Sequence, residues 1–320
     1  MSFTKLINNK INLKNKQKFV GIIGSEPSKG ARSPILWNKA FSKLKINMKM
    51  FPLDVKDQNV GKLISSLKKN NYFFASAVTV PHKERVIQYL DDIDMPAQEI
   101  GSVNLIVKEK NKLKGYNTDS LGCRYTLSKI KKNIKNILII GCGGAGKACI
   151  ISVKNKYSKA NIYLFNRDLK KLKKFYKRIK INKKNIKIIK NYNTFKKLKK
   201  LDLIINTTSL GFDLNIKTIK SNFKYFSPIS YSEIKLNKID NFKNIIINNI
   251  IETVDFLRTN SNAIIFDIIY KPSKTIIMKV GEKIGLKSIN GLEMNFMQAV
   301  EAFKIVNKKI KMKKIINAMK

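Results

Sequence analysis

Short apolar runs alternate with amphipathic stretches along the first part of the chain. The runs have the length of strands, and the stretches between them repeat apolar residues at helical spacing. Predicted strands cover residues 19–24, 48–55, 73–80, 103–107 and 112–116. Predicted helices cover residues 33–44 and 60–69, with weaker helical signals from 83 to 90. This alternation predicts an α/β domain over residues 19–118.

The second part of the chain repeats the alternation and adds a glycine-rich turn. An apolar run, Ile137–Ile140, leads into Gly141, Gly143 and Gly146, which have the spacing G-x-G-x-x-G. A helix and then a second strand, 161–165, are predicted next. Strand, tight turn and helix in this order are typical of a dinucleotide-binding unit, in which the backbone approaches a pyrophosphate at the helix N-terminus. The glycine motif alone is a weak signal, and the flanking strand and helix strengthen it.

These elements predict a two-domain α/β protein. Residues 119–289 would form a Rossmann-like domain, with further strands at 186–189, 202–206 and 262–269 and a helix at 274–283. A helix over 119–131 would make the first connection between the domains. A longer helix over 290–306 would return to the first domain and complete it.

Three segments lack a clear place in either domain. Residues 213–258 are rich in Lys, Asn and Ile without clean periodicity, and are predicted to be an inserted loop or a small excursion with no chemistry of its own. Residues 1–18 carry no acid and are predicted to be a disordered extension rather than a targeting segment. Residues 307–320 are predicted to be a basic tail, either a solvated helix or a frayed end.

The tip of the second Rossmann strand bears on the choice of cofactor. NAD sites usually place an acid there, where it accepts from the ribose 2′-hydroxyl. This chain has Asn166 and Arg167 there, with Lys170 and Lys171 close behind, and these cations favour the 2′-phosphate of NADP. Asp168 is open to two interpretations, a ribose contact or the cap of the next helix. The two lysines can equally be ordinary surface residues, because lysine is abundant throughout the chain.

The net charge of +44 raises the question of nucleic acid. The chain has 59 lysines and only 6 arginines, together with abundant Asn and Ile, which favours AT-rich coding drift over a selected phosphate-binding surface. No specific nucleic-acid partner is therefore predicted. Three cysteines without a C-x-x-C pair and a single histidine predict neither a metal site nor disulfides, and so a cytoplasmic protein. No apolar run reaches the roughly 18 residues that a membrane span requires.

Five separated segments, taken together, resemble the shikimate dehydrogenase family. They are Ser33-Pro34 with Asn38, residues 78–84 (VTVPHKE), residues 100–104 (IGSVN), residues 116–119 (YNTD), and residues 291–294 (GLEM) with Gln298-Ala299. The glycine turn, the strand tip, residues 206–211 (NTTSLG) and residues 267–275 (DIIYKPSKT) fit the same family. Each segment is weak alone, but their combination over residues 19 to about 306 is highly specific.

The resemblance implies an NADP-dependent enzyme that interconverts 3-dehydroshikimate and shikimate in a cleft between two α/β domains. It implies Lys83 and Asp119 as the catalytic pair. The implied substrate-binding residues are Ser33, Thr79, Asn104, Asp119, Tyr270 and Gln298. The implied cofactor-binding residues are Gly141, Cys142, Gly143, Gly144, Ala145, Asn166, Arg167, Asp168, Lys170, Lys171, Ile268 and Gly291. The expected partner is a small-molecule substrate, and the chain is expected to be a monomer or a homodimer.

The chemistry fits these residue types. Reducing a ketone by hydride leaves an alkoxide, to which a positioned lysine can donate a proton. Asp119 would hold Lys83 in place and accept from a substrate hydroxyl, although a helix N-cap would also explain an Asp there. Thr79 and Asn104 have side chains that both donate and accept, as ring hydroxyls require. Ordinary strand-end capping would explain these two residues as well.

Other candidates have simpler explanations beside the functional ones. Tyr270 and Ser33 can bind a substrate carboxylate, but Tyr270 also suits a half-buried core position. Gln298 lies among apolar residues of the returning helix and so needs a polar partner, for which the substrate is one candidate. His82 is expected to be a packed or solvent-facing imidazole, and no role is assigned to it.

The chain departs from the family pattern at Ala31, Trp37 and Ala77. Ala31 stands where the family usually has a second small hydroxyl, so one hydrogen bond to the substrate carboxylate would be lost unless Arg32 compensates. Two alternatives therefore stay open at this stage. One is an NAD-accepting quinate/shikimate dehydrogenase, and the other is a degraded homologue that binds nucleotide without turnover.

Overall fold

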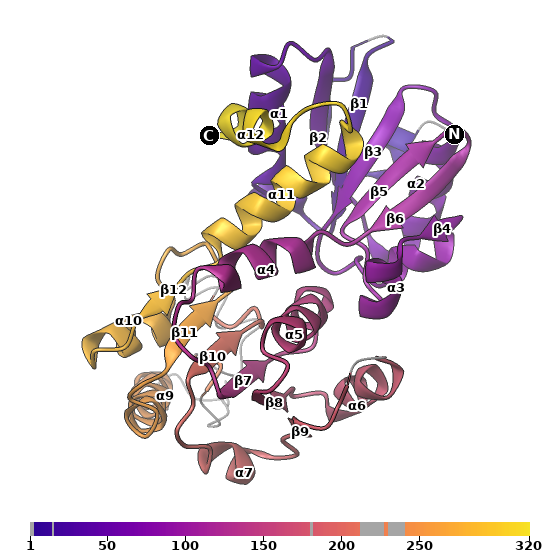
Figure 1. The fold of residues 1–320 in the computed structure, drawn as a ribbon. Helices are drawn as coiled ribbons and strands as arrows, with labels where there is room; N and C mark the ends of the chain where they lie inside the picture. Colours follow the sequence, from indigo (N-terminus) through magenta and orange to yellow (C-terminus); the bar gives the residue numbers. More distant parts are fainter. Residues whose placement is uncertain (1–2, 15, 180–181, 212–226, 230–240) are drawn as a thin grey trace. The chain divides into compact units, whose positions relative to one another are not determined.

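The computed structural model describes residues 3–14, 16–179, 182–211, 227–229 and 241–320. The chain divides into two compact units (Figure 1). Unit 1 consists of residues 1–123 and 296–320, and unit 2 of residues 124–295. The predicted two-domain α/β fold is confirmed, and the chain passes between the units within two helices rather than at the predicted boundaries of 118 and 290.

Unit 1 is built on a six-stranded mixed sheet with the order β2-β1-β3-β5-β6-β4. Its strands are β1 (Lys18–Gly24), β2 (Met48–Asp54), β3 (Phe73–Val78), β4 (Asp92–Ile93), β5 (Leu105–Glu109) and β6 (Lys112–Tyr116). Strand β1 pairs in parallel with β2 and β3, whereas β5 runs antiparallel to both β3 and β6. Strand β6 therefore points in the same direction as β3.

Side chains alternate between the two faces of this sheet, and each face is covered by helices. In β1, Val20 and Ile22 face one hydrophobic cluster while Phe19 and Ile23 face the other. The first face is covered by α1 (Ser33–Lys43), α11 (Leu292–Val306) and α12 (Met312–Met319). The second face is covered by α2 (Val60–Lys69), α3 (Met95–Ile100) and the 3-10 helices η1 (Phe3–Leu6) and η4 (Arg85–Tyr89).

The prediction of a disordered N-terminal extension is wrong for the described part of residues 1–18. Phe3 is 4% exposed, and its ring stacks on Phe19 with 5.2 Å between the ring centroids. Asn9 then bonds edge strand β2, donating to the Pro52 carbonyl and accepting from the Asp54 amide. A few apolar anchors and amide pairs thus order a segment whose average composition is polar.

The tail forms a helix, which was one of the two alternatives predicted for it, but the prediction that this helix is solvated is wrong. Helix α12 repeats apolar residues at helical spacing and buries Ile315, Ala318 and Met319 in the same cluster as Trp37 of α1. The lysines of α12 lie outside this buried set, so a basic composition coexists with an amphipathic face.

Unit 2 contains a six-stranded, fully parallel sheet with the order β12-β11-β10-β7-β8-β9. Its strands are β7 (Asn136–Ile140), β8 (Asn161–Phe165), β9 (Ile186–Ile188), β10 (Leu203–Asn206), β11 (Ile264–Asp267) and β12 (Ser288–Ile289). Its helices are α4 (Asp119–Ser128, shared with unit 1), α5 (Gly144–Lys156), α6 (Leu169–Arg178), α7 (Tyr192–Lys196), α9 (Asn241–Arg258) and α10 (Ile276–Lys283). The chain order reverses between β7 and β10, which is the switch point at which such sheets bind dinucleotides.

The predicted insertion over residues 213–258 is partly wrong. Residues 241–258 form helix α9, whose Phe256 and Leu257 are buried in the unit 2 core beside Phe195 of α7. Residues 213–226 and 230–240 of the predicted insertion lie outside the described residues. Within the described ranges, no helix combines the length and apolar character needed to cross a bilayer.

Candidate active site

One edge of the unit 1 sheet gathers most of the candidate substrate residues. Strands β3 and β6 end at this edge, and β5, which runs antiparallel to both, begins there. The segment after β3 supplies Lys83, the residue before β5 is Asn104, and the segment after β6 leads to Asp119. Strand order, rather than sequence distance, brings these three side chains together.

Lys83 and Asp119 form the central couple of this edge. Nζ of Lys83 donates to Oδ2 of Asp119 at 2.5 Å. The Lys83 side chain is 16% exposed and that of Asp119 is 6% exposed. Asp119 is the first residue of α4, where the helix dipole favours a negative charge. The pair is therefore largely withdrawn from water, although part of the Lys83 side chain remains accessible to solvent.

Two amide side chains extend the couple. Nδ2 of Asn104 lies 3.0 Å from Oδ1 of Asp119, so it donates to the carboxylate oxygen that Lys83 does not bond. The same nitrogen lies 3.2 Å from Oε1 of Gln298 on α11. Thr118 fixes this arrangement, since its backbone N–H donates to Oδ1 of Asn104 and its hydroxyl donates to the Gln298 carbonyl. Four predicted site residues thus form one hydrogen-bonded group.

The other unit 1 candidates lie outside this group of bonds. Ser33 is the first residue of α1, and Arg32, which has helical backbone angles, is the N-cap. Ser33 is nevertheless buried, at 8% exposure. Thr79 follows β3 and lies against Gly24, where an added Cβ would come within 2.4 Å of the Thr79 methyl carbon. Gly24 therefore makes room for Thr79 at the same edge of the sheet.

The glycine turn of unit 2 has the geometry that an anion-binding site needs. Gly141 has a φ of +107°, and a Cβ there would lie 2.5 Å from the Thr207 hydroxyl. Gly143 is the N-cap of α5, is exposed, and has open space where a Cβ would point. No side chain caps this helix, and its first turn contains no acid. The first N–H groups of α5 are therefore oriented toward an open, Cβ-free approach, which fits a pyrophosphate.

At the strand tip after β8, Asp168 caps the next helix, which is one of its two interpretations. Oδ1 of Asp168 accepts from the Lys171 backbone N–H at 2.8 Å, which caps α6. Arg167 and Lys170 are exposed beside it, and Asn166 donates to the Asp168 carbonyl at 2.7 Å. One carboxylate oxygen of Asp168 thus caps the helix, and the exposed tip also carries the cations Arg167 and Lys170.

Two further unit 2 candidates, Ile268 and Gly291, contact each other through their backbones. A Cβ added at Gly291 would lie 1.8 Å from the Ile268 carbonyl oxygen, so no other residue fits there without movement. Gly291 also donates its N–H to the Ile269 carbonyl at 2.9 Å. Tyr270, the next residue along, is half-buried.

A buried polar cluster at the ends of β10 and β11 was missed as part of the site. Asp267 accepts from the Asn206 amide, from the Ile269 N–H and from the Thr275 hydroxyl at 2.8 Å. Burial raises the pKa of Asp267 to about 6, although these donors act to lower it. Thr207, next to Asn206, packs on both Gly141 and Gly146. The sequence segments that carry these residues resemble the family, but the sequence alone did not show that Asn206 and Asp267, 61 residues apart, contact each other.

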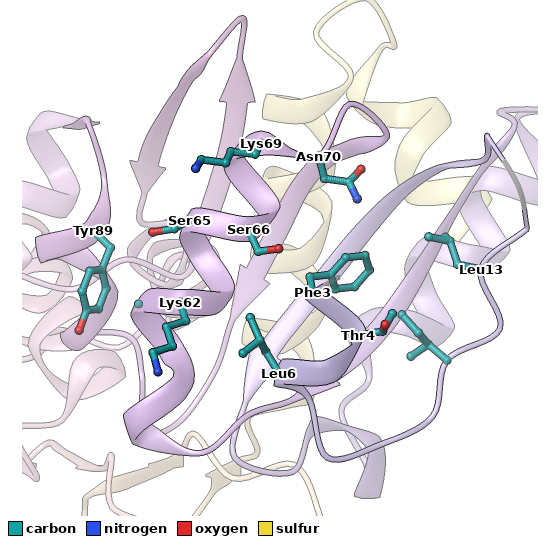
Figure 2. Close-up of a pocket in the computed structure, with 12 residues that line it drawn as sticks. Phe3, Thr4, Leu6, Leu13, Lys62, Ser65, Ser66, Lys69, Asn70 and Tyr89 are labelled. Atoms are coloured by element: carbon teal, nitrogen blue, oxygen red, sulfur yellow. The ribbon is translucent and has the colours of Figure 1, made fainter. Parts of the chain in front are cut away.

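A separate cavity of about 980 Å³ lies in unit 1 between the N-terminal segment and α2. Figure 2 shows Phe3 and Leu6 on one side of it, with Lys62 and Ser65 of α2 on the other. None of the predicted site residues lines this cavity. The cavity is a consequence of the packed N-terminal segment rather than part of the candidate active site.

A parallel sheet with a glycine turn at its switch point, together with a buried lysine–carboxylate couple in the other unit, defines a class of protein: the dinucleotide-dependent oxidoreductases. Residues 22–106 match the family model described as the shikimate dehydrogenase substrate binding domain. The chain is 33% identical over 296 residues to the shikimate dehydrogenase (NADP(+)) of Methanococcus maripaludis, covering 92% of this chain and 93% of that protein. The chain belongs to the shikimate dehydrogenase family.

Solved structures agree with this assignment. A crystal structure of a shikimate dehydrogenase in complex with NADP+ is 30% identical, with a TM-score of 0.71 and 95% of each chain covered. The shikimate dehydrogenase of Aquifex aeolicus is 25% identical, with a TM-score of 0.72, over 96% of this chain and 99% of the other. The likeness therefore spans both units and is not confined to the nucleotide-binding fold.

Proposed function

We propose that the protein is an NADP-dependent shikimate dehydrogenase, which reversibly reduces 3-dehydroshikimate to shikimate in aromatic amino-acid biosynthesis. The observation that carries the proposal is the Lys83–Asp119 couple, with 2.5 Å between Nζ and Oδ2, at an edge of the sheet lined with amides. Family membership supplies the substrate class, since relatives that cover over nine-tenths of this chain are named for this reaction.

Lys83 is the proton donor in the reductive direction. NADPH, when bound, supplies the hydride that goes to the carbonyl carbon of the substrate. The carbonyl oxygen gains negative charge, and Nζ of Lys83 stabilises that charge and then transfers a proton to it. In the reverse direction, Lys83 takes the hydroxyl proton.

Asp119 and the amides orient the partners of this transfer. Asp119 holds Nζ and accepts from a neighbouring substrate hydroxyl through an oxygen that is otherwise shared with Asn104. Asn104 and Gln298 each present an amide able to bind ring hydroxyls. Ser33, Thr79 and Tyr270 are proposed to complete the site by binding the substrate carboxylate and hydroxyls.

The residues of unit 2 fit NADP(H). The pyrophosphate would lie on the N–H groups at the start of α5, where Gly141, Cys142, Gly143, Gly144 and Ala145 form the turn. Arg167 and the lysines at the strand tip would bind the 2′-phosphate, and this is supported by Asp168 using Oδ1 to cap α6. Ile268 and Gly291 would contact the nicotinamide end.

The test is a steady-state assay of shikimate oxidation by the purified protein, with NADP+ and NAD+ compared at equal concentration. We expect NADP+ to be preferred in kcat/KM by about 10-fold or more, and shikimate to be preferred over quinate. Preference for NAD+ would remove the role given to Arg167. Absence of nucleotide reduction with either cofactor, while NADP+ still binds, would identify a degraded homologue instead.

The proposal also covers the compartment and the oligomeric state of the enzyme. The three cysteines are buried and form no disulfide among the described residues, which suits the reducing cytoplasm in which we place the protein. We place it there as a monomer or homodimer, and light scattering after gel filtration would distinguish the two.

A further inference from the structure

Asp54 is a buried carboxylate at the edge of the unit 1 sheet that gathers the candidate substrate residues. It is the last residue of β2, and in the parallel register it lies opposite Gly24, the last residue of β1. Strands β1, β2 and β3 run in parallel, so all three end at the edge that leads to Lys83. Asp54 is 6% exposed. None of the ion pairs that the structure describes includes Asp54, so its carboxylate depends on hydrogen bonds.

Both oxygens of this carboxylate are bonded by one residue of the β1–α1 loop, Ser28. Oδ1 accepts from the Ser28 backbone N–H at 2.9 Å, and Oδ2 accepts from the Ser28 hydroxyl. Bonds to an ionised acceptor are about twice as strong as bonds between neutral groups. The backbone of Asp54 is fixed as well, because its N–H donates to the Asn9 side chain and its carbonyl accepts from the Asn8 N–H. Asp54 therefore ties the loop to a strand end that is itself held in place.

The tie lies shortly before Ser33, the candidate ligand of the substrate carboxylate. Ser28 belongs to the 3-10 helix η2 (Pro27–Lys29), and α1 begins at Ser33. The connection between the two helices is short and bonded within itself, since the Ala31 N–H donates to the Pro27 carbonyl at 3.1 Å. No side chain caps the N-terminus of α1. The position of Ser33 therefore depends on the loop that precedes it.

We propose that Asp54 is a positioning residue, which places Ser33 for the substrate carboxylate by holding the β1–α1 loop through Ser28. The proposal rests on the proposed function, because that function assigns Ser33 to the substrate. Ala31 has no hydroxyl and the Ser28 hydroxyl bonds Asp54, so within residues 28–33 only Ser33 offers a hydroxyl to a ligand. A displaced Ser33 weakens the grip on the substrate, while the catalytic couple is held by other segments.

The first test compares two substitutions of Asp54. Asp54→Ala removes both acceptors, whereas Asp54→Asn keeps an oxygen for the Ser28 N–H and gains an NH₂ group that can donate to the Ser28 hydroxyl oxygen. We expect Asp54→Ala to raise the KM for shikimate about 10-fold or more, with kcat within about 3-fold and the KM for NADP+ unchanged. Asp54→Asn should stay within about 3-fold of wild type in all three constants. An unchanged KM for shikimate in Asp54→Ala, or equal increases in both variants, would overturn the proposal.

The second test asks whether Asp54 acts through Ser28. Ser28→Ala removes the hydroxyl bond and keeps the backbone bond, so the KM for shikimate should rise by only about 3-fold. The double variant Ser28→Ala/Asp54→Ala should match Asp54→Ala alone, because the two substitutions remove the same contact. If the two increases multiply instead, Asp54 does not act through Ser28.

Asp91→Ala is the control for the loss of a structural carboxylate in unit 1. Asp91 also accepts from one backbone N–H and one side chain, those of Leu113 at 2.7 Å and Lys68 at 2.5 Å. These bonds lie near the start of β6, whereas the site lies beyond its end. Asp91→Ala should lower the unfolding free energy and keep the KM for shikimate within about 2-fold of wild type. A KM increase equal to that of Asp54→Ala would mean that the effect is a general loss of stability.

Hydrogen exchange measures the tie without turnover. Asp54→Ala should speed exchange of the Ser28 N–H by about 10-fold or more, and Asp54→Asn should keep most of its protection. Unchanged exchange in Asp54→Ala would show that the carboxylate does not hold the loop. A protein that shows the exchange difference but does not oxidise shikimate would refute the proposed function, whereas oxidation with an unchanged KM in Asp54→Ala would refute the role of Asp54.

Discussion

Removing Lys83 and Asp119 singly and together tests whether they act as one unit. Lys83→Ala deletes the ammonium that lies 2.5 Å from the Asp119 carboxylate. A positioned general acid contributes about 10²- to 10⁴-fold to rate, so kcat should fall by about 100-fold or more, equivalent to at least about 2.7 kcal/mol of transition-state stabilisation. The KM for NADP+ should stay within about 2-fold, because the glycine turn belongs to the other unit.

The structure also sets an expectation for stability. Without Lys83, the Asp119 carboxylate at 6% exposure keeps the Asn104 amide as a donor but loses its cation. A fully buried unpaired charge costs about 3–5 kcal/mol, and the path to water at the lysine position reduces this cost to about 1–3 kcal/mol. Chemical denaturation of Lys83→Ala should show that loss, and the lysine variant should still bind NADP+.

Asp119→Asn keeps the shape of the side chain and removes its charge. If the two residues work as a couple, the double variant should lose little more kcat than the worse single variant. The assay is initial-rate shikimate oxidation for wild type, both single variants and the double variant. Losses that multiply, with the double variant slower than either single one by about the product of both effects, would refute the couple as a unit.

Lys68→Ala is the control for charge alone. Lys68 and Asp91 in unit 1 also approach to 2.5 Å, but their side chains are 37% and 29% exposed. An exposed pair of this kind contributes about 0–1 kcal/mol to stability. Lys68→Ala should therefore leave kcat within about 2-fold of wild type, and an equal loss in both lysine variants would mean that the effect of Lys83 is general charge removal.

Three other predictions concern two glycines of unit 2, the protonation of Asp267 and the N-terminal segment. Gly143→Ala should weaken NADP+ binding about 10-fold or more without changing the melting temperature, since the added Cβ meets no protein atom within 4 Å. Gly291→Ala should instead lower the unfolding free energy by about 3 kcal/mol or more, since the added Cβ would lie 1.8 Å from the Ile268 carbonyl oxygen. Burial raises the pKa of Asp267 from 3.8 to about 6, so the folded state holds the proton more tightly than the unfolded chain. The unfolding free energy of wild type should therefore fall by about 2 kcal/mol relative to Asp267→Asn as pH rises from about 4 to 6, and an unchanged difference would contradict the shift. Phe3→Ala should cost about 2–4 kcal/mol in urea unfolding, because the ring is buried against Phe19, and a cost near zero would mean that the N-terminal segment does not hold the fold.

The sequence was most informative where a single local pattern decides the structure. Apolar runs located most of the described strands to within a few residues, because a strand buried on both faces needs little else. The two-residue edge strands β4 and β12 were not predicted, since they contain no apolar run. The glycine turn was readable for a similar reason, since Gly141 requires a positive φ and Gly143 an open approach. Both requirements concern residues close together in the chain, so they are visible as a short sequence motif.

The sequence was least informative where composition masked a sparse signal. The tail was expected to be solvated because of its lysines, yet Ile315, Ala318 and Met319 repeat at helical spacing and are buried. Phe3 was similarly hidden among polar residues, although one aromatic ring is enough to anchor a short segment. Asn104 and Gln298 are 194 residues apart and contact each other only because α11 packs on the unit 1 sheet. No local sequence pattern encodes a contact of this kind.

Lysine abundance also shows why charge alone could not single out Lys83. Burial alone could not do so either, because Lys147 and Lys154 are each only 5% exposed and are accommodated by an aromatic ring and a backbone carbonyl. What distinguishes Lys83 is a partner that is itself buried. Among the ion pairs that the structure describes, the Lys83–Asp119 pair has both side chains less than one-fifth exposed, while every other pair has at least one side chain more than one-third exposed. Two charges withdrawn together from water are costly for stability alone, so their retention at a sheet edge argues for chemistry.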